Sequence, residues 1–151
     1  MLKKIQLFFE KYVIQEQTGG ESVEHSLNLA AAALLVEMIF QDDEIHENEV
    51  KAVKALMIEQ LGLSSQEAEN LYLLAQQERQ QATDYHQFTQ LIARHYTQQQ
   101  KIKLIESLWR VAFADHVLDR YEEHMVRRIS DLIHVSHKDF IQAKHRVQKS
   151  L

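Results

Sequence analysis

The sequence contains no cysteine and no proline, and only three of its 151 residues are glycine. Without cysteine, the chain can form no disulfide bond, no thiolate metal site and no cysteine nucleophile. Hairpins and tight turns rely on glycine and proline, so their scarcity favours long helices joined by short turns. Leu, Ala, Gln, Glu and Lys, which all form helices well, dominate the composition. The expected fold class is therefore all-α.

Long hydrophobic runs are also lacking. The longest apolar stretch, residues 27–40, contains Asn28 and Glu37 and is too short to cross a bilayer. The N-terminus has a charged start but neither the apolar core nor the small-residue cleavage site of a secretion signal. We therefore expect a cytoplasmic protein without membrane insertion, in which residues 27–40 form a buried central helix.

Apolar residues recur at helical spacing along the whole chain, which has the size of one domain with a single core. Two Ser-initiated motifs, at Ser64 and Ser136, have the pattern of helix N-caps. We predict one compact bundle of seven to eight helices over residues 1–151. The expected helices cover approximately residues 2–17, 21–41, 50–61, 65–78, 85–96, 101–114, 120–133 and 137–148.

The most informative feature that is present is an internal repeat. Residues 38–56 read MIFQDDEIHENEVKAVKAL, and residues 111–129 read VAFADHVLDRYEEHMVRRI. In register, the pairs are Phe40 and Phe113, Asp42 and Asp115, Ile45 and Leu118, Glu49 and Glu122, and Val53 and Val126. Leu63-Ser64 and Val135-Ser136 correspond after a slip of one residue. We therefore expect two pseudo-symmetric helix–acidic corner–helix halves, at about residues 25–78 and 98–148.

Acidic side chains crowd both corners. The first corner holds Asp42, Asp43, Glu44, Glu47 and Glu49, and the second holds Asp115, Asp119, Glu122 and Glu123. Calcium and magnesium prefer several converging oxygen ligands, so the corners are a candidate divalent-cation site, although their spacing is not that of an EF-hand. His46 and His116 would add imidazole ligands, which transition metals accept.

The same acids also have a structural explanation. Asp119 and Glu122 have the spacing of a capping box, which His46 and Glu49 imitate, and acids in a first turn favour the positive end of a helix. Asp42 and Asp115 would bond to backbone amides of the corners. Capping and cation binding both remain open at this point.

The two halves of the chain differ in charge. Residues 1–75 hold 13 acids and 5 bases, net −8, whereas residues 76–151 hold 9 acids and 12 bases, net +3. This asymmetry fits a charged partner, a homodimer of two copies, or two differently solvated faces. Aromatic residues lie at core spacing and are not interleaved with bases, so no nucleic-acid surface is expected.

Catalytic motifs are missing as well. The sequence has no phosphate-binding loop, no nucleophile elbow and no His-Glu-x-x-His zinc helix. No Glu-x-x-His pair recurs on two helices, as a di-iron bundle would require. The residues therefore give no positive indication of an enzyme.

The second acidic corner, residues 113–129, together with its earlier copy, resembles the TerB-like (tellurite-resistance protein B) family over about residues 25–148. The N-terminal domain of some membrane-anchored DnaJ-like co-chaperones is also similar. The resemblance implies an all-helical bundle of two pseudo-symmetric halves, a role in resistance to tellurite and other stresses, and suspected metal sites at the corners. The metal ligands it implies are Asp115, Asp119, Glu122, Glu123, Asp42 and Glu49.

The chain departs from the family pattern at both corners. Asp43 and His116 stand where the family often has glycine, so we predict a positive φ at both. His46 replaces the acid found at Asp119, which makes the first corner the weaker site.

We therefore expect a non-enzymatic module for protein interaction or stress response, with a divalent cation at the acidic corners as its one candidate cofactor. The alternative is a metal-dependent hydrolytic enzyme whose corner carboxylates hold a metal that activates water. A deep polar pocket joining both corners would favour the enzyme, and shallow, separated corners would favour the module.

Overall fold

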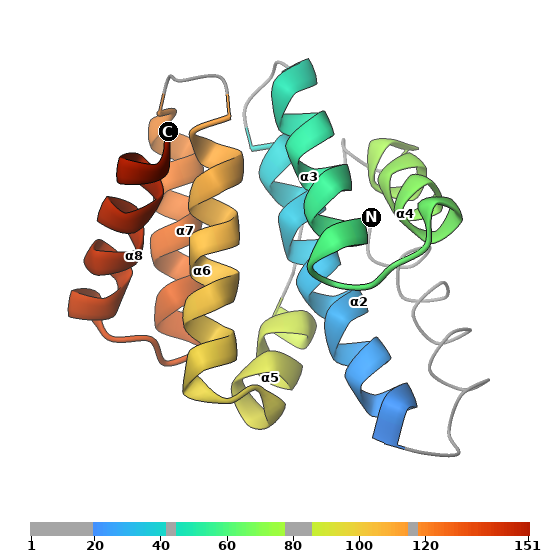
Figure 1. The fold of residues 1–151 in the computed structure, drawn as a ribbon, viewed down its shortest axis with the longest axis horizontal. Helices are drawn as coiled ribbons and strands as arrows, with labels where there is room; N and C mark the ends of the chain where they lie inside the picture. The colour runs from blue at the N-terminus through green and yellow to red at the C-terminus, as the bar shows by residue number, and fades with distance from the viewer. Residues whose placement is uncertain (1–19, 42–44, 78–85, 115–117) are drawn as a thin grey trace.

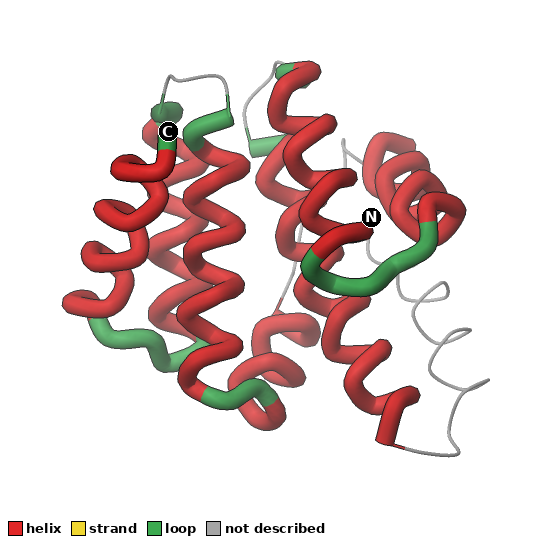
Figure 2. Tube along the Cα trace, in the orientation of Figure 1, coloured by secondary structure: helices red, strands yellow, loops and turns green. Residues whose placement is uncertain are grey.

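The computed structural model describes residues 20–41, 45–77, 86–114 and 118–151, and all regular structure in these residues is helical (Figures 1 and 2). This confirms the predicted all-α fold. The expected helix near residues 2–17 lies outside the described residues. No described helix is both long enough and apolar enough to span a membrane. The described helices are α2 (Gly20–Ile39), α3 (Glu47–Glu59), α4 (Ser65–Gln77), α5 (His86–His95), α6 (Gln98–Ala112), α7 (Arg120–Leu132) and α8 (His137–Ser150).

Helix α2 is the central element of the bundle. It packs against α3, α4, α5 and α6, and residues 29–39 are all at most 3% exposed. A helix that is apolar all round has to be buried all round. The four alanines of residues 30–33 allow its neighbours to approach closely. The prediction of a buried central helix in this stretch is confirmed.

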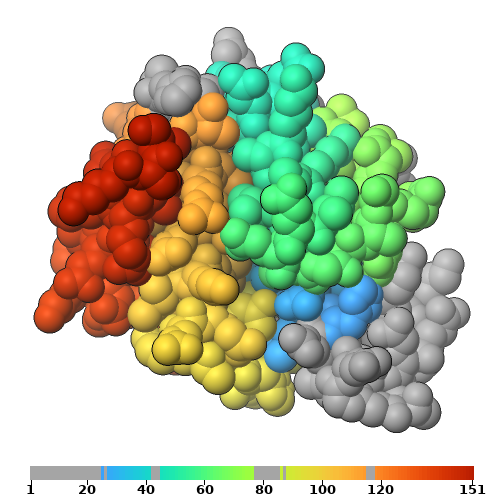
Figure 3. All heavy atoms as spheres, in the orientation of Figure 1, coloured from blue at the N-terminus to red at the C-terminus, as the bar shows by residue number. Residues whose placement is uncertain are grey.

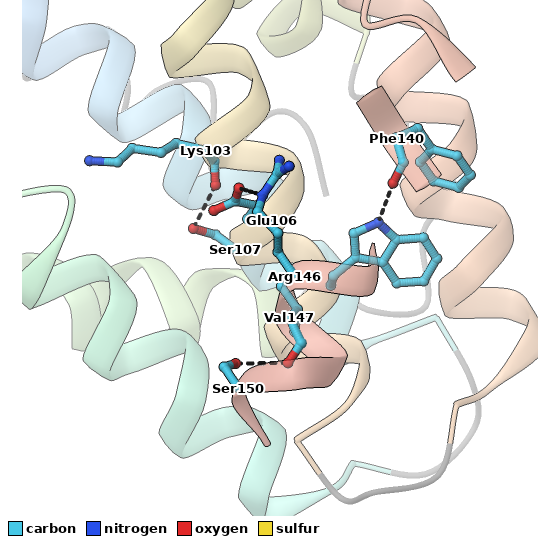
Figure 4. Close-up of polar contacts among 8 residues, drawn as sticks. Lys103, Glu106, Ser107, Phe140, Arg146, Val147 and Ser150 are labelled. Carbon is cyan, nitrogen blue, oxygen red and sulfur yellow. Dashed lines mark hydrogen bonds and ion pairs between the residues drawn. The ribbon is translucent and has the colours of Figure 1, made fainter. Parts of the chain in front are cut away.

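Helix α6 joins α2 and α3 to the C-terminal helices α7 and α8. Its Trp109 is fully buried, and the indole Nε1 donates a hydrogen bond to the Phe140 carbonyl of α8 at 3.3 Å (Figure 4). The Trp109 ring also lies 5.1 Å from the Phe140 ring and 5.7 Å from the Phe113 ring. Buried aromatic rings with a satisfied polar group are strong packing anchors. At the surface, Arg146 Nε pairs with Glu106 Oε1 at 2.7 Å across the same two helices (Figure 4).

Helix bounds follow the repeat. When Val53 is aligned with Val126, the first and last residues of α3 align with the first and last residues of α7. In the same alignment, the last residue of α2 aligns with the last residue of α6. Val53 and Val126 are both fully buried, as an equal register against the core requires. The pseudo-two-fold axis that we expect to relate the halves stays a prediction.

The one-residue slip has its origin at the ends of α3 and α7. The Leu63 amide donates to the Met57 carbonyl, six residues earlier, whereas the Val135 amide donates to the Ser130 carbonyl, only five residues earlier. The first copy therefore uses one more residue to leave its helix. As a result, α8 begins one position earlier than the repeat alone would place it. The first residue of α4, Ser65, aligns with Lys138, but α8 begins at His137.

Side-chain caps explain where three helices begin. Ser64 Oγ accepts from the Glu67 amide at 3.0 Å, and Ser136 Oγ accepts from the Asp139 amide at 3.1 Å. Both caps were predicted from the sequence. The predicted start of α6 at residue 101 is wrong by three residues, because Thr97 and Gln100 form a reciprocal capping box that starts the helix at residue 98.

A side-chain hydrogen bond links α4 to the central helix. Glu67 Oε2 lies 2.8 Å from His25 Nε2 of α2, and Glu67 Oε1 accepts from the Ser64 amide at 3.0 Å. Burial raises the pKa of Glu67, but the hydrogen bonds from Ser64 and His25 outweigh it, so the pKa is lowered from 4.5. The charged form of Glu67 therefore stabilises the fold.

Two residues in equivalent turns adopt left-handed backbone. Gly62 follows α3 with φ +66°, and His134 follows α7 with φ +67°. After α7, the His134 and Val135 amides donate to the Asp131 and Ser130 carbonyls, which is a Schellman motif. The residues predicted to have positive φ, Asp43 and His116, lie outside the described residues.

The left-handed turn gives a first prediction. His134→Gly should raise the free energy of unfolding by about 1 kcal/mol, because this conformation strains an L-residue but not glycine. Gly62→Ala should lower it by a similar amount, since a Cβ there meets nothing within 4 Å and only the backbone strain counts. Urea denaturation measures both. The control is His124→Gly on the exposed face of α7, which should destabilise by about 0.5 kcal/mol because His is itself a weak helix former. Destabilisation by His134→Gly would contradict the explanation.

The Glu67 contacts give a second prediction. Glu67→Gln keeps a residue suited to the capping box but removes the charge, so the free energy of unfolding at pH 7 should fall by about 1 kcal/mol. A carboxyl group with a lowered folded-state pKa stabilises above its unfolded pKa, and this contribution is lost as the pH falls through the folded value. The difference between wild type and variant should therefore shrink and then vanish as the pH falls below 4.5. A difference that stays constant with pH in urea melts would refute the charge effect, and exposed Glu59→Gln is the control.

Candidate functional site at the acidic end

Four helix ends meet at one end of the bundle. Helices α2 and α6 end there, and α3 and α7 begin there, at the top of Figure 1. Both acidic corners are therefore attached to the same end of the molecule. The N-termini of α3 and α7 carry partial positive charge, which favours acids in their first turns. These acids are Glu47 and Glu49 in α3, and Glu122 and Glu123 in α7.

Two of these glutamates are buried at equivalent positions. Glu49 and Glu122 are each the third residue of their helix, and each is only 1% exposed. Burying a carboxylate costs several kcal/mol unless hydrogen bonds or opposite charges compensate for the lost hydration. Two such groups in corresponding turns mark this end as chemically distinct from the rest of the core.

A third buried carboxylate comes from the central helix. Glu37 of α2 is 2% exposed and lies in the last turns of that helix. Glu37 was not among the residues predicted for the site. The available signal was its position as the one acid in the apolar stretch of residues 27–40.

Asp119 acts as the N-cap of α7. Its Oδ1 accepts a hydrogen bond from the Tyr121 amide at 2.6 Å. His46 occupies the equivalent N-cap position of α3 with similar extended backbone, but without a side-chain capping bond. Asp119 is thus an N-cap, as predicted, through the Tyr121 amide, whereas the His46 side chain does not cap α3.

Glu123 is engaged with α8. Its Oε1 lies 3.5 Å from Lys144 Nζ, and the same ammonium lies 5.3 Å from the centre of the Trp109 ring. The half-buried Glu123 is therefore held toward α8 by a cationic neighbour. To join a cation site at the second corner, it would have to exchange this contact for the ion.

The predicted ligand set is only partly described. Asp119, Glu122, Glu123 and Glu49 lie at the acidic end, whereas Asp42 and Asp115, with Asp43 and His116, fall outside the described residues. Within the described ranges, no group of three or more His, Asp or Glu side chains is arranged to hold a metal ion.

A cavity of about 400 Å³ opens elsewhere, where α2 is flanked by the end of α3 and the start of α6. Figure 3 shows this face, on which α3 and α6 lie side by side. At the cavity, the Tyr96 hydroxyl donates to Asn28 Oδ1 at 3.3 Å, and the Ser107 hydroxyl donates to Gln60 Oε1 at 2.9 Å. The lining contains none of the predicted site residues. It consists of Asn28, Ala31, Leu35, Leu56, Glu59, Gln60, Leu61, Tyr96, Gln100, Lys103, Leu104 and Ser107.

Comparison with known proteins gives one match. Residues 28–145 match the family described as "Tellurite resistance protein TerB". No curated protein and no solved structure matches the chain. The match covers both acidic corners and every described helix from most of α2 to most of α8. The chain therefore belongs to the TerB family of tellurite resistance proteins.

Proposed function

We propose that this protein is a non-enzymatic, cytoplasmic stress-response module of the TerB type, which binds protein partners and takes up a divalent cation at its acidic end. The observation that carries the proposal is the burial of Glu49 and Glu122 in equivalent first turns at one end of the bundle. Family membership supports the link to tellurite resistance.

The cation follows from the charge at the acidic end. The first turns of α3 and α7 each hold a buried glutamate and a second acid. A divalent cation would offset the negative charge of these carboxylates. Calcium and magnesium prefer carboxylate oxygens, and bind best where several converge. The residues that would hold the ion are Asp115, Asp119, Glu122 and Glu123 at the second corner and Asp42 and Glu49 at the first.

The module is preferred to a hydrolytic enzyme because of where the cavity lies. A metal-dependent hydrolase needs a polar pocket beside the metal, so that a substrate reaches the activated water. The cavity of about 400 Å³ instead adjoins the end of α3 and the start of α6, whereas the acidic corners adjoin the opposite ends of these helices. A groove of about 360 Å³ between α7 and α8 includes Glu123 of the second corner but no residue of the first, so it does not join the two corners. This placement supports a binding role for the acidic end.

Calorimetric titration and thermal melting test the cation. Wild type should bind calcium or magnesium with measurable heat, and an ion at about 100 times its dissociation constant should stabilise the fold by about 2.7 kcal/mol. Asp119→Asn should leave the stability of the ion-free protein nearly unchanged, because Asn caps a helix as well as Asp does. It should nevertheless weaken ion binding, as should Asp115→Asn, because each removes a negative ligand.

The matched control is Asp131→Asn, an exposed acid near the other end of α7. It should leave both the heat and the melting temperature unchanged. If calcium, magnesium and zinc produce neither heat nor a melting shift with wild type, the acids serve as caps and the cation part of the proposal fails.

A further inference from the structure

A basic groove runs between α7 and α8. We define it by Arg120, His124 and Arg127 of α7 and by His137, Phe140 and Ile141 of α8. Its volume is about 360 Å³. The Arg and His side chains at its rim are exposed, Ile141 is half-buried, and Phe140 is buried.

The cationic side chains form one stripe along α7. Positions 120, 124 and 127 follow the spacing of one helix face. At a rise of about 1.5 Å per residue, the two arginines stand about 10 Å apart along the helix axis. His137, in the first turn of α8, brings the positive end of a second helix to the same groove.

Two acids lie near this stripe: Glu123 in the groove lining, and Asp119, whose charge acts on Arg120. Glu123 is the one acid of the groove lining, and it pairs with Lys144 at 3.5 Å. None of the ion pairs among the described residues includes Arg120, His124 or Arg127. Arg120 donates a long hydrogen bond of 3.5 Å to the Tyr121 hydroxyl. This hydroxyl is neutral, so the bond does not neutralise the positive charge of Arg120.

The floor of the groove is apolar. The His137 ring lies 5.7 Å from the Phe140 ring, and Ile141 is the next residue along α8. Positive charge around an apolar floor suits a ligand that carries both carboxylates and an apolar side chain. The backbone of a nucleic acid supplies no apolar side chain for this floor.

We propose that the basic groove binds an extended acidic segment of a partner protein, whose carboxylates lie on Arg120 and Arg127 and whose apolar side chain lies over Ile141. In the polyproline II form a chain advances about 3.1 Å per residue with three residues per turn, so acids three residues apart share one face and lie about 9 Å apart, close to the spacing of the two arginines. This inference rests on the partner-binding part of the proposed function, and its peptide test is separate from the test of cation binding.

The test uses a fluorescein-labelled peptide of sequence Gly-Ser-Glu-Leu-Ser-Glu-Gly-Ser and a control peptide with Gln for Glu. Fluorescence anisotropy at low salt should show that wild type binds the Glu peptide and binds the Gln peptide at least about tenfold more weakly. The double variant Arg120→Glu, Arg127→Glu should weaken binding of the Glu peptide at least about tenfold.

The matched control is Arg128→Glu, which changes the charge of α7 in the same direction but lies outside the groove lining. It should change the affinity less than about twofold, because exposed charges away from the contact are screened. Urea melts of the double variant should match wild type, which separates lost binding from lost folding.

Three results would overturn the proposal: no binding of the Glu peptide, equal binding of the Gln peptide, or equal weakening by Arg128→Glu. Arginine-dependent binding to phosphatidylserine vesicles without peptide binding would instead assign the groove to a membrane. Self-association in sedimentation that is lost in Arg127→Glu would assign it to a second copy. Each of these outcomes rejects peptide binding by the groove but not the proposed cation site, because calorimetry measures cation binding in a separate experiment without the peptide.

Discussion

The structure depends on the burial of α2 on every side. Residues 29–39 of this helix are excluded from water, so α3, α4, α5 and α6 must all pack around it. Burial of this much apolar surface is the dominant favourable term in folding. The same helix also shapes the candidate site. Its last turns place Glu37 in the core, and it ends at the end of the bundle where the first acidic corner begins and where α6 leads into the second corner.

At the acidic end, the same residues contribute to helix stability and to the proposed function. The first turns of α3 and α7 favour acids because helix N-termini are positive, and Asp119 caps α7 through the Tyr121 amide. Capping alone requires no buried carboxylate, yet Glu49 and Glu122 are among the least exposed residues of the chain. Places where a sequence departs from the simplest structural rules are often functional sites, and the cation proposal gives these buried carboxylates a function.

The sequence was sufficient for features that arise from local chemistry. The all-α class, the buried central helix, the caps at Ser64 and Ser136 and the bounds of α7 within one residue were all predicted. The groove between α7 and α8 was not predicted, because it appears only when distant segments meet. Glu37 was not included in the predicted site, although its position in the apolar stretch of residues 27–40 was a signal. The early start of α6 was missed although Thr97 and Gln100 carry its signal. The left-handed His134 was missed because its repeat partner Gly62 is shifted by the one-residue slip.

The central claim is that this TerB protein binds a protein partner under the control of a cation at its acidic end. The most direct measurement is affinity capture from the native cell with wild type and Asp115→Asn, each in calcium plus magnesium and in chelator. The account predicts a partner that wild type retains with the ions, that chelator releases, and that the variant retains poorly, with Asp131→Asn behaving as wild type. Capture that is identical in all conditions, or a substrate consumed by the purified protein, would contradict it.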